Sequence, residues 1–216
     1  MVTHNLGQIN SILNTFISEL RDKTIQKDSM RFRRNIERTG EILAYEMSKT
    51  INYREFEIAT PLGIKNMLLP SDDLVICSIL RAGIPLHRGL LNYFDRAENA
   101  FISAYRKKGE NHEDIIQVDY FASPLLEGKT LILVDPMLAT GQSLMNVYNS
   151  LVSHGNPSKL HIISVIASVP GISYLNQFFD NSVDFWVASV DESLNKKGYI
   201  VPGLGDAGDL AFGTKL

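Results

Sequence analysis

Cysteine is nearly absent from this chain of 216 residues, whose single thiol is Cys77. One cysteine excludes an internal disulfide and suits a reducing cytoplasm, where we expect the protein to reside. The first fourteen residues lack the basic segment and apolar run of a secretion signal. No stretch approaches the roughly 20 apolar residues that a membrane helix needs, so we expect no membrane association.

An excess of charge is also missing, because 21 Lys and Arg face 24 Asp and Glu for a net charge of -3. This balance gives no reason to expect nucleic-acid binding. The basic stretch 31–38 is accompanied by Glu37 and Glu41, which favours a salt-bridged helix face, with RNA binding as the alternative. The five histidines have no metal-ligand spacing, and Cys77 lies in an apolar run typical of a core strand.

What the sequence does contain is a regular alternation of apolar patterns. Helices are expected over 6–20, 29–49, 85–94, 144–154 and 172–179, and strands over 74–80, 100–105, 130–134, 160–167 and 183–190. Strands that alternate with helices predict an α/β fold with a mainly parallel sheet flanked by helices. The length fits one domain over residues 1–216. Ligands of such sheets bind beyond the carboxyl ends of the strands.

A polar segment rich in charge, residues 106–128, follows one predicted strand. We interpret it as a long flexible loop or a hairpin. Connections of this length inside a compact domain are often functional lids.

The segment from Asp135 to Ser143 joins a buried strand to a helix. Small and hydroxyl residues at such a junction leave backbone N–H groups free to bind an anion, and the helix N-terminus adds positive potential. A monophosphate would fit, with the Asp135 carboxylate accepting hydrogen bonds from sugar hydroxyls. The alternative is an ordinary helix start capped by Ser143.

Two further motifs carry chemistry. Arg81 follows a buried strand and can bind phosphate oxygens in a fork, while Gly83 permits unusual backbone angles; the alternative is a surface arginine in a turn. Residues 198–209 match a dinucleotide-binding glycine pattern literally, but too few residues follow for the helix and strand that such a site requires. Their apolar content argues against a disordered tail and favours a shaped loop with exposed backbone.

Together these segments resemble the uracil phosphoribosyltransferase family, a type I phosphoribosyltransferase family. The segments are "ILRAG" at 79–83, "VDPMLATG.S" at 134–143 and "YIVPGLGDAGD..FGTK" at 199–215, in the family's order. "RFRRNIERTGEILAYE" and "TPLGI" extend the resemblance over nearly the whole chain. The resemblance implies transfer of the 5-phosphoribosyl group of 5-phosphoribosyl-1-pyrophosphate (PRPP) to N1 of uracil, giving UMP and pyrophosphate.

The resemblance also implies roles for individual residues. Arg81, Arg106 and Asp206 would be catalytic, and uracil would contact Ile200, Gly205, Asp206 and Ala207. PRPP would contact Arg81, Arg106 and Asp206 together with the loop residues Asp135, Pro136, Met137, Leu138, Ala139, Thr140, Gly141, Gln142 and Ser143. No protein ligand for a metal is expected, because Mg²⁺ is held mainly by PRPP and water.

A hood over the base site is implied for the C-terminal segment 190–216, and the N-terminal helices in 1–50 would contribute to the hood and to a subunit interface. Family members form dimers or larger assemblies, and some are activated by GTP. Departures from the family include Gln142 in place of glycine, which is strained if that position needs a positive φ and harmless if it is helical. Ile84 and Pro85 replace a more flexible pair.

Two rival functions remain on the sequence alone. One is a regulatory protein that keeps the fold to sense nucleotides or bind RNA, and the basic stretch 31–38 is its support. The other is a phosphoribosyltransferase for a different base.

Overall fold

The central feature of the computed structural model is a mixed sheet with the strand order β1-β10-β9-β7-β4-β5-β6. All neighbouring pairs are parallel except β5 and β6. The structure describes residues 1–108 and 114–215, without the side chains of residues 104–119. The strands are β1 (Val2–Asn5), β4 (Leu74–Leu80), β5 (Glu98–Lys108), β6 (Asp114–Ala122), β7 (Thr130–Val134), β8 (Met137–Leu138), β9 (Lys159–Ser168) and β10 (Asp184–Asp191). The mainly parallel α/β fold is therefore confirmed.

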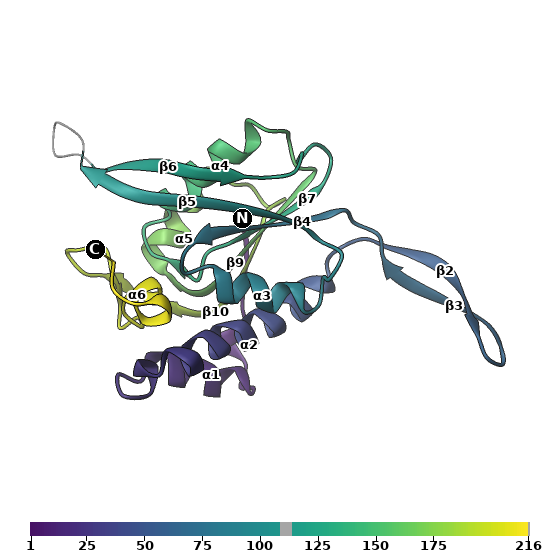
Figure 1. Ribbon diagram of the computed structural model, residues 1–216, viewed down its shortest axis with the longest axis horizontal. Helices are drawn as coiled ribbons and strands as arrows, with labels where there is room; N and C mark the ends of the chain where they lie inside the picture. Colours follow the sequence, from purple (N-terminus) through teal and green to yellow (C-terminus); the bar gives the residue numbers. More distant parts are fainter. Residues whose placement is uncertain (109–113, 216) are drawn as a thin grey trace.

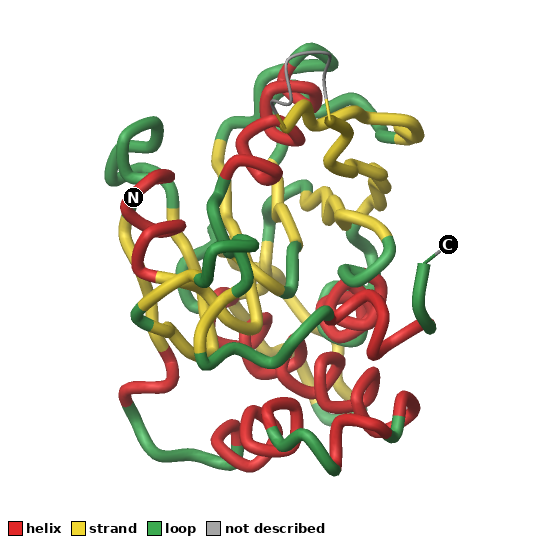
Figure 2. Tube along the Cα trace, turned by 90° about the vertical axis from the view of Figure 1, so that its left-hand side faces the viewer, coloured by secondary structure: helices red, strands yellow, loops and turns green. Residues whose placement is uncertain are grey.

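Helices cover both faces of this sheet (Figures 1 and 2). They are α1 (Leu13–Arg21), α2 (Ser29–Ser48), α3 (Ile84–Leu91), α4 (Gln142–Val152), α5 (Val169–Leu175) and α6 (Ala207–Phe212). The N-terminal helices α1, α2 and α3, together with α6, pack on one face, and α4 and α5 pack on the other. Within the described residues, no helix combines the length and apolarity needed to cross a membrane.

The central strands follow directly from their apolar runs. Every residue of β7 is buried, as is every residue of β4 before Leu80. Ile76 pairs with Ile132 and joins the core under the N-terminal helices, whereas Cys77 pairs with Leu133 and joins the core under α4 and α5. Alternate residues thus supply two apolar cores, as expected for a parallel sheet covered on both faces.

The opening of the chain differs from the helix expected over 6–20. Val2–Asn5 pairs with β10 as the edge strand β1, and a 3₁₀ turn follows at Leu6–Gln8, where the Asn5 side chain accepts a hydrogen bond from the N–H of Gly7. Helix α1 begins only at Leu13, so Ile9 and Ile12 are exposed. Backbone pairing with the sheet edge overrides the helical spacing of the first apolar residues.

The edge strand β1 also brings His4 onto the only tryptophan of the chain. The imidazole ring of His4 stacks on Trp186 at a centroid distance of 3.9 Å, and its Nε2 lies 2.8 Å from Oδ1 of Asp184. On the other side, Trp186 Nε1 donates to Nδ1 of the fully buried His161. These contacts fasten the N-terminus to the sheet.

Helix α5 lies at Val169–Leu175 instead of the expected 172–179. The hydroxyl of Ser168 accepts a hydrogen bond from the N–H of Gly171 at 2.9 Å, and Pro170 occupies the first turn. The capping residue Ser168 is the last residue of β9, one position beyond the predicted strand 160–167, so the helix starts directly at the end of the strand.

Two hairpins extend the fold (Figure 1). Strands β5 and β6 form an antiparallel pair, which confirms the hairpin alternative for residues 106–128, although its connecting residues 109–113 lie outside the described part. The hairpin of β2 (Tyr53–Thr60) and β3 (Gly63–Pro70) was not predicted and projects away from the body with most of its side chains exposed. A two-stranded pair, β11 (Ser193–Leu194) and β12 (Ile200–Val201), precedes α6.

Candidate functional site

The junction between β7 and α4 encloses a small cavity of about 190 Å³. Its lining includes most of the predicted phosphate loop, namely Asp135, Met137, Leu138, Ala139, Thr140, Gly141 and Ser143, together with Ile79 and Leu144. Pro136 is buried, and its carbonyl accepts hydrogen bonds from the N–H groups of Val165 and Ile166 on β9. Hydrogen bonds to β9 therefore anchor the loop to the sheet, and most residues of the loop line the cavity.

Gly141, and not Gln142, is the residue with a positive φ at this junction. Gly141 has φ +79° and precedes α4, whereas Gln142 is the exposed first residue of the helix. A side chain at Gly141 would also meet Tyr174 Cδ1 at 2.8 Å. The helical branch of the expectation for Gln142 is thus the one found, and glutamine causes no strain there.

Ser143 does not cap this helix, contrary to the alternative interpretation of the loop. The N-cap position belongs to Gly141, which has no side chain to fill it, and Ser143 lies in the first turn. The first N–H groups of any α-helix lack partners within that helix. The first turn of α4 also contains no acidic side chain that would repel an anion. The junction retains the donors and the positive potential that an anion requires.

Asp135 supplies the negative charge of this cavity. Its Oδ1 accepts a hydrogen bond from the N–H of Met137 at 3.2 Å. Burial raises the pKa of the Asp135 carboxyl to about 6, against the opposing effect of that hydrogen bond. A carboxylate held at the end of β7 in this way can accept hydrogen bonds from the hydroxyl groups of a sugar.

Arg81 follows β4 at the same edge of the sheet and is half-buried. One guanidinium nitrogen, Nη2, lies 3.0 Å from the carbonyl oxygen of Gly213 and 3.5 Å from Oδ1 of Asp209. The buried Nε has no hydrogen-bond partner among the described residues. Arg81 therefore faces the C-terminal segment and retains donor capacity, unlike an ordinary surface arginine in a turn.

Gly83 is required for a reason other than the predicted one. Its φ of -69° is accessible to any residue. A Cβ at this position would lie 2.4 Å from Ser78 Oγ and 2.6 Å from the carbonyl oxygen of Ile79. Close backbone packing, and not an unusual backbone angle, excludes a side chain here.

The C-terminal glycine-rich segment is an ordered loop between β12 and α6. Ile200, Leu204 and Ala207 are buried, which excludes the disordered-tail interpretation. Gly203 and Gly205 have φ values of +61° and +90°, and a side chain at Gly203 would approach the carbonyl oxygen of Ile200 to 2.2 Å. The peptide bonds Leu80–Arg81 and Val201–Pro202 are cis.

Asp206 occupies the N-cap of α6. Its Oδ1 accepts a hydrogen bond from the N–H of Asp209 at 3.0 Å. This cap is a structural function that the sequence analysis did not assign to Asp206, although an Asp three residues before another acidic residue is a recognisable start signal.

The three predicted motifs meet at one edge of the sheet. Ile79, at the end of β4, lines the same cavity as Asp135 and Thr140, and Arg81 contacts Asp209 in the C-terminal helix. Arg106 lies on β5, next to β4 in the sheet, but its side chain is outside the described part of the structure.

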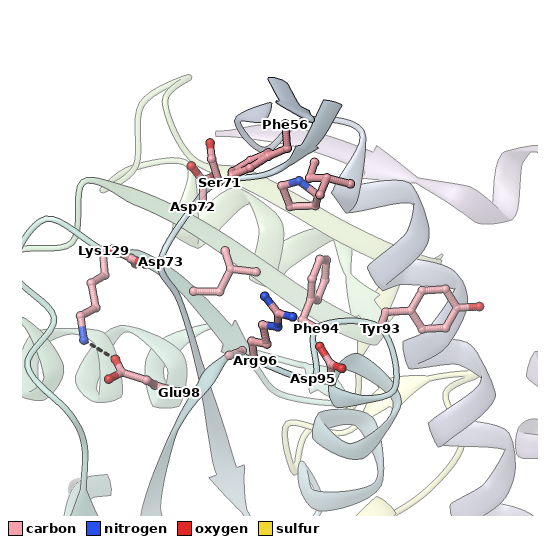
Figure 3. Close-up of a pocket in the computed structure, with 14 residues that line it drawn as sticks. Phe56, Ser71, Asp72, Asp73, Tyr93, Phe94, Asp95, Arg96, Glu98 and Lys129 are labelled. Atoms are coloured by element: carbon pink, nitrogen blue, oxygen red, sulfur yellow. Dashed lines mark hydrogen bonds and ion pairs between the residues drawn. The ribbon is translucent and has the colours of Figure 1, made fainter. Parts of the chain in front are cut away.

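A larger cavity of about 920 Å³ lies elsewhere, where β4, β5 and β7 begin (Figure 3). Phe56, Phe94 and Arg96 line it, and Lys129 forms an ion pair with Glu98 at its rim. Because parallel strands begin at one edge and end at the other, this cavity lies across the sheet from the phosphate loop. Although this cavity is larger, we place the candidate site at the carboxyl edge, because ligands of parallel sheets bind there and the predicted motifs lie there.

Comparisons with known proteins agree with the family resemblance of the sequence motifs. The family model described as "Uracil phosphoribosyltransferase" matches residues 9–214. A uracil phosphoribosyltransferase of Porphyromonas gingivalis is 49% identical over 98% of both chains, and one of Thermococcus gammatolerans is 41% identical over 93% of this chain and 88% of that protein.

Solved structures agree on the fold. The AQ2163 protein of Aquifex aeolicus superimposes with a TM-score of 0.87 at 30% identity, covering all of both chains. A hypoxanthine phosphoribosyltransferase of Staphylococcus aureus, with a TM-score of 0.51 at 15% identity over 75% of this chain and 76% of that one, shares the fold alone.

Proposed function

This chain belongs to the uracil phosphoribosyltransferase family, and from that premise we propose that it joins uracil to PRPP in pyrimidine salvage, giving UMP and pyrophosphate. The observation that carries this proposal is the meeting of three segments at the carboxyl edge of the sheet. There the cavity of the phosphate loop, the Arg81 turn and the capped C-terminal loop are neighbours.

Breaking the bond between ribose C1 and pyrophosphate builds positive charge on the sugar and negative charge on the leaving group. The work of the protein is therefore mainly positioning and charge stabilisation. The N–H groups before and within the first turn of α4 would hold the 5-phosphate, and Asp135 would bind the ribose hydroxyls. Arg81 and Arg106 would neutralise the pyrophosphate as its charge develops.

Uracil presents two carbonyl acceptors on either side of an N–H donor. We assign its recognition to the loop at Ile200 and Gly205 to Ala207. Two backbone N–H groups of this loop would donate to the carbonyl oxygens of uracil, and a backbone carbonyl would accept from its N–H. Asp206 would add electrostatic stabilisation near N1. Cytosine reverses two of these positions and would leave buried groups unpaired, a mismatch that can discriminate by roughly 10⁴-fold.

Mg²⁺ fits this arrangement as a partner of PRPP, because Asp135 brings a carboxylate to the same edge of the sheet as Arg81. We propose that pyrophosphate oxygens and water hold the ion and that the Asp135 carboxylate contacts its water shell. When bound, the ion would neutralise charge on the leaving group. The described residues contain no cluster of three or more metal-ligating side chains.

We further propose that residues 1–216 act as one cytoplasmic domain and associate as a homodimer or a larger homo-oligomer. The exposed apolar side chains of Leu62, Ile64 and Leu68 on the β2–β3 hairpin, and of Met30 and Tyr45 on α2, support self-association. The family resemblance also implies GTP as an activator, to which we assign no residues.

One assay tests the function directly. The purified protein is incubated with uracil, PRPP and Mg²⁺, and UMP and pyrophosphate are quantified; equal formation of the two products is expected. Parallel reactions with cytosine and with hypoxanthine should give negligible nucleotide. Comparable turnover of cytosine would refute the proposed base recognition, and titration of GTP into the same assay measures activation.

The rival regulatory function would be favoured by tight UMP or RNA binding without turnover. The basic stretch that supports it is largely engaged within the protein: Arg34 pairs with Glu37 and Glu41, and Arg33 donates to the carbonyl of Ala211.

A further inference from the structure

A buried ion pair outside the substrate-binding motifs holds the backbone of the C-terminal loop. Arg21, the last residue of α1, forms a two-pronged pair with Asp191 at the end of β10, with both N–O distances at 2.8 Å. The exposed fraction of the two side chains is 21% and 7%. Such forked, shielded pairs are geometrically specific and stronger than exposed ones.

The same ion pair forms hydrogen bonds with both the carbonyl oxygen and the N–H of Gly203. Nη1 of Arg21 donates to the Gly203 carbonyl oxygen at 3.0 Å, while the N–H of Gly203 donates to Oδ2 of Asp191 at 3.1 Å. The other guanidinium nitrogen donates to the hydroxyl of Ser189 at 3.0 Å. Gly203 has a positive φ, and glycine adopts positive and negative φ about equally readily. These contacts therefore select one orientation of the two peptide planes that flank Gly203.

A second residue of the N-terminal segment supports the next step of the loop. Nε2 of Gln26 donates to the carbonyl of Leu20 at 2.9 Å and to the carbonyl of Leu204 at 3.3 Å. The loop backbone at 203 and 204 is thus fixed from the side of α1. The following residues, Gly205 to Ala207, are those assigned to the pyrimidine.

We propose that Arg21, acting through Asp191 and Gly203, is a positioning residue for the base loop and sets the affinity for the pyrimidine. The inference rests on the proposed function. A loop that reads a base through its backbone must hold its N–H and C=O directions before the base arrives, since side chains contribute little to the match. Arg21 supplies this order from an element that carries none of the assigned substrate contacts.

The test compares Arg21→Lys and Asp191→Asn with Lys23→Ala, a matched control that removes a nearby exposed charge. Lysine keeps the charge of Arg21 but cannot reproduce its fork. The expected result for Arg21→Lys is a rise of roughly tenfold or more in the KM for uracil, with the KM for PRPP and kcat each within about threefold of wild type. Asp191→Asn should act in the same direction, and Lys23→Ala should change nothing.

Equilibrium binding separates positioning from general damage. UMP and ribose 5-phosphate share the sugar phosphate, so Arg21→Lys should weaken UMP binding by the same factor and leave ribose 5-phosphate binding unchanged. Equal weakening of both ligands, or an unchanged KM for uracil, would overturn the inference. Arg21→Ala is the harsher variant, and if it fails to fold, the lysine and asparagine variants still decide. Failure of the wild-type chain to form UMP would instead refute the proposed function.

Discussion

The guanidinium of Arg81 lies 3.5 Å from the carboxylate of Asp209, which joins the turn after β4 to the C-terminal helix. Both side chains are partly exposed, at 39% and 34%. The arginine proposed to receive pyrophosphate therefore already has an anionic neighbour. The leaving group of PRPP must compete with this carboxylate for the same guanidinium.

Replacing Asp209 by asparagine should remove this competition while keeping the shape of the side chain. Partly exposed ion pairs contribute about 0.2–1 kcal/mol, so we expect the KM for PRPP to fall by roughly 1.4- to fivefold with little change in the KM for uracil. Initial rates at varied PRPP measure the effect. A raised KM for PRPP would mean that Asp209 assists binding, for example through the water shell of Mg²⁺.

The substitution Asp135→Asn should weaken catalysis and strengthen the fold. Loss of an ionic acceptor for ribose hydroxyls should lower kcat/KM for PRPP by roughly 10- to 100-fold. Because burial raises the Asp135 pKa from 3.8 to about 6, the ionised carboxyl destabilises the folded state above pH 6. The neutral variant should gain on the order of 1 kcal/mol in unfolding free energy at pH 7.5, a gain that thermal or urea unfolding measures and that should vanish toward pH 4.

The same carboxyl predicts how PRPP binding depends on pH. As pH falls through about 6, Asp135 takes up a proton and loses acceptor strength, so the KM for PRPP should rise. The Asp135→Asn variant is the control, because titration of PRPP itself affects both proteins alike. Parallel pH profiles for the two proteins would exclude Asp135 as the titrating group.

Gly141 and Gln142 offer a matched pair of substitutions in the phosphate loop. Gly141→Ala places a side chain on a φ of +79° and within 2.8 Å of Tyr174, which should cost about 1–3 kcal/mol and raise the KM for PRPP markedly. Gln142→Gly lies at an exposed helical position and should cost less than about 1 kcal/mol with an unchanged KM. Unfolding curves and PRPP kinetics on both variants check this contrast, and equal effects would contradict it.

Asp206 has two separable roles, a helix cap and a proposed negative charge near uracil N1. Asparagine caps as well as aspartate, whereas alanine loses about 1 kcal/mol of capping. We expect both Asp206→Asn and Asp206→Ala to lower kcat strongly, with only the alanine variant losing stability. If the asparagine variant keeps its rate at saturating substrate, the charge is not used and Asp206 serves the helix alone.

The sequence predicted the parts of the fold in which local and tertiary preferences agree. The strands at 74–80 and 130–134 are found with the same bounds, because nearly complete burial makes each strand a continuous apolar run in the sequence. The helix at 29–49 was placed to within one residue, since Asp28 caps it by accepting the N–H of Arg31. The segment from Asp135 to Ser143 lies between a buried strand and a helix, as predicted, and its binding of phosphate stays a prediction.

The remainder depends on contacts between residues far apart in the chain. The β2–β3 hairpin has exposed faces and therefore no burial pattern that alternates between core and solvent. The pair of Arg21 and Asp191 joins residues 170 positions apart, and neither belongs to a recognisable motif. Whether position 142 needs a positive φ was left open by the sequence, and Gly141 is the residue that has one, because only the helix start fixes which residue turns.

The stacking of His4 on Trp186 provides the chain with an intrinsic optical probe. The indole is the only one in the protein, so its emission arises from a single place, where the first strand docks. Steady emission spectra can thus follow the seating of the N-terminus during unfolding or assembly without any attached label.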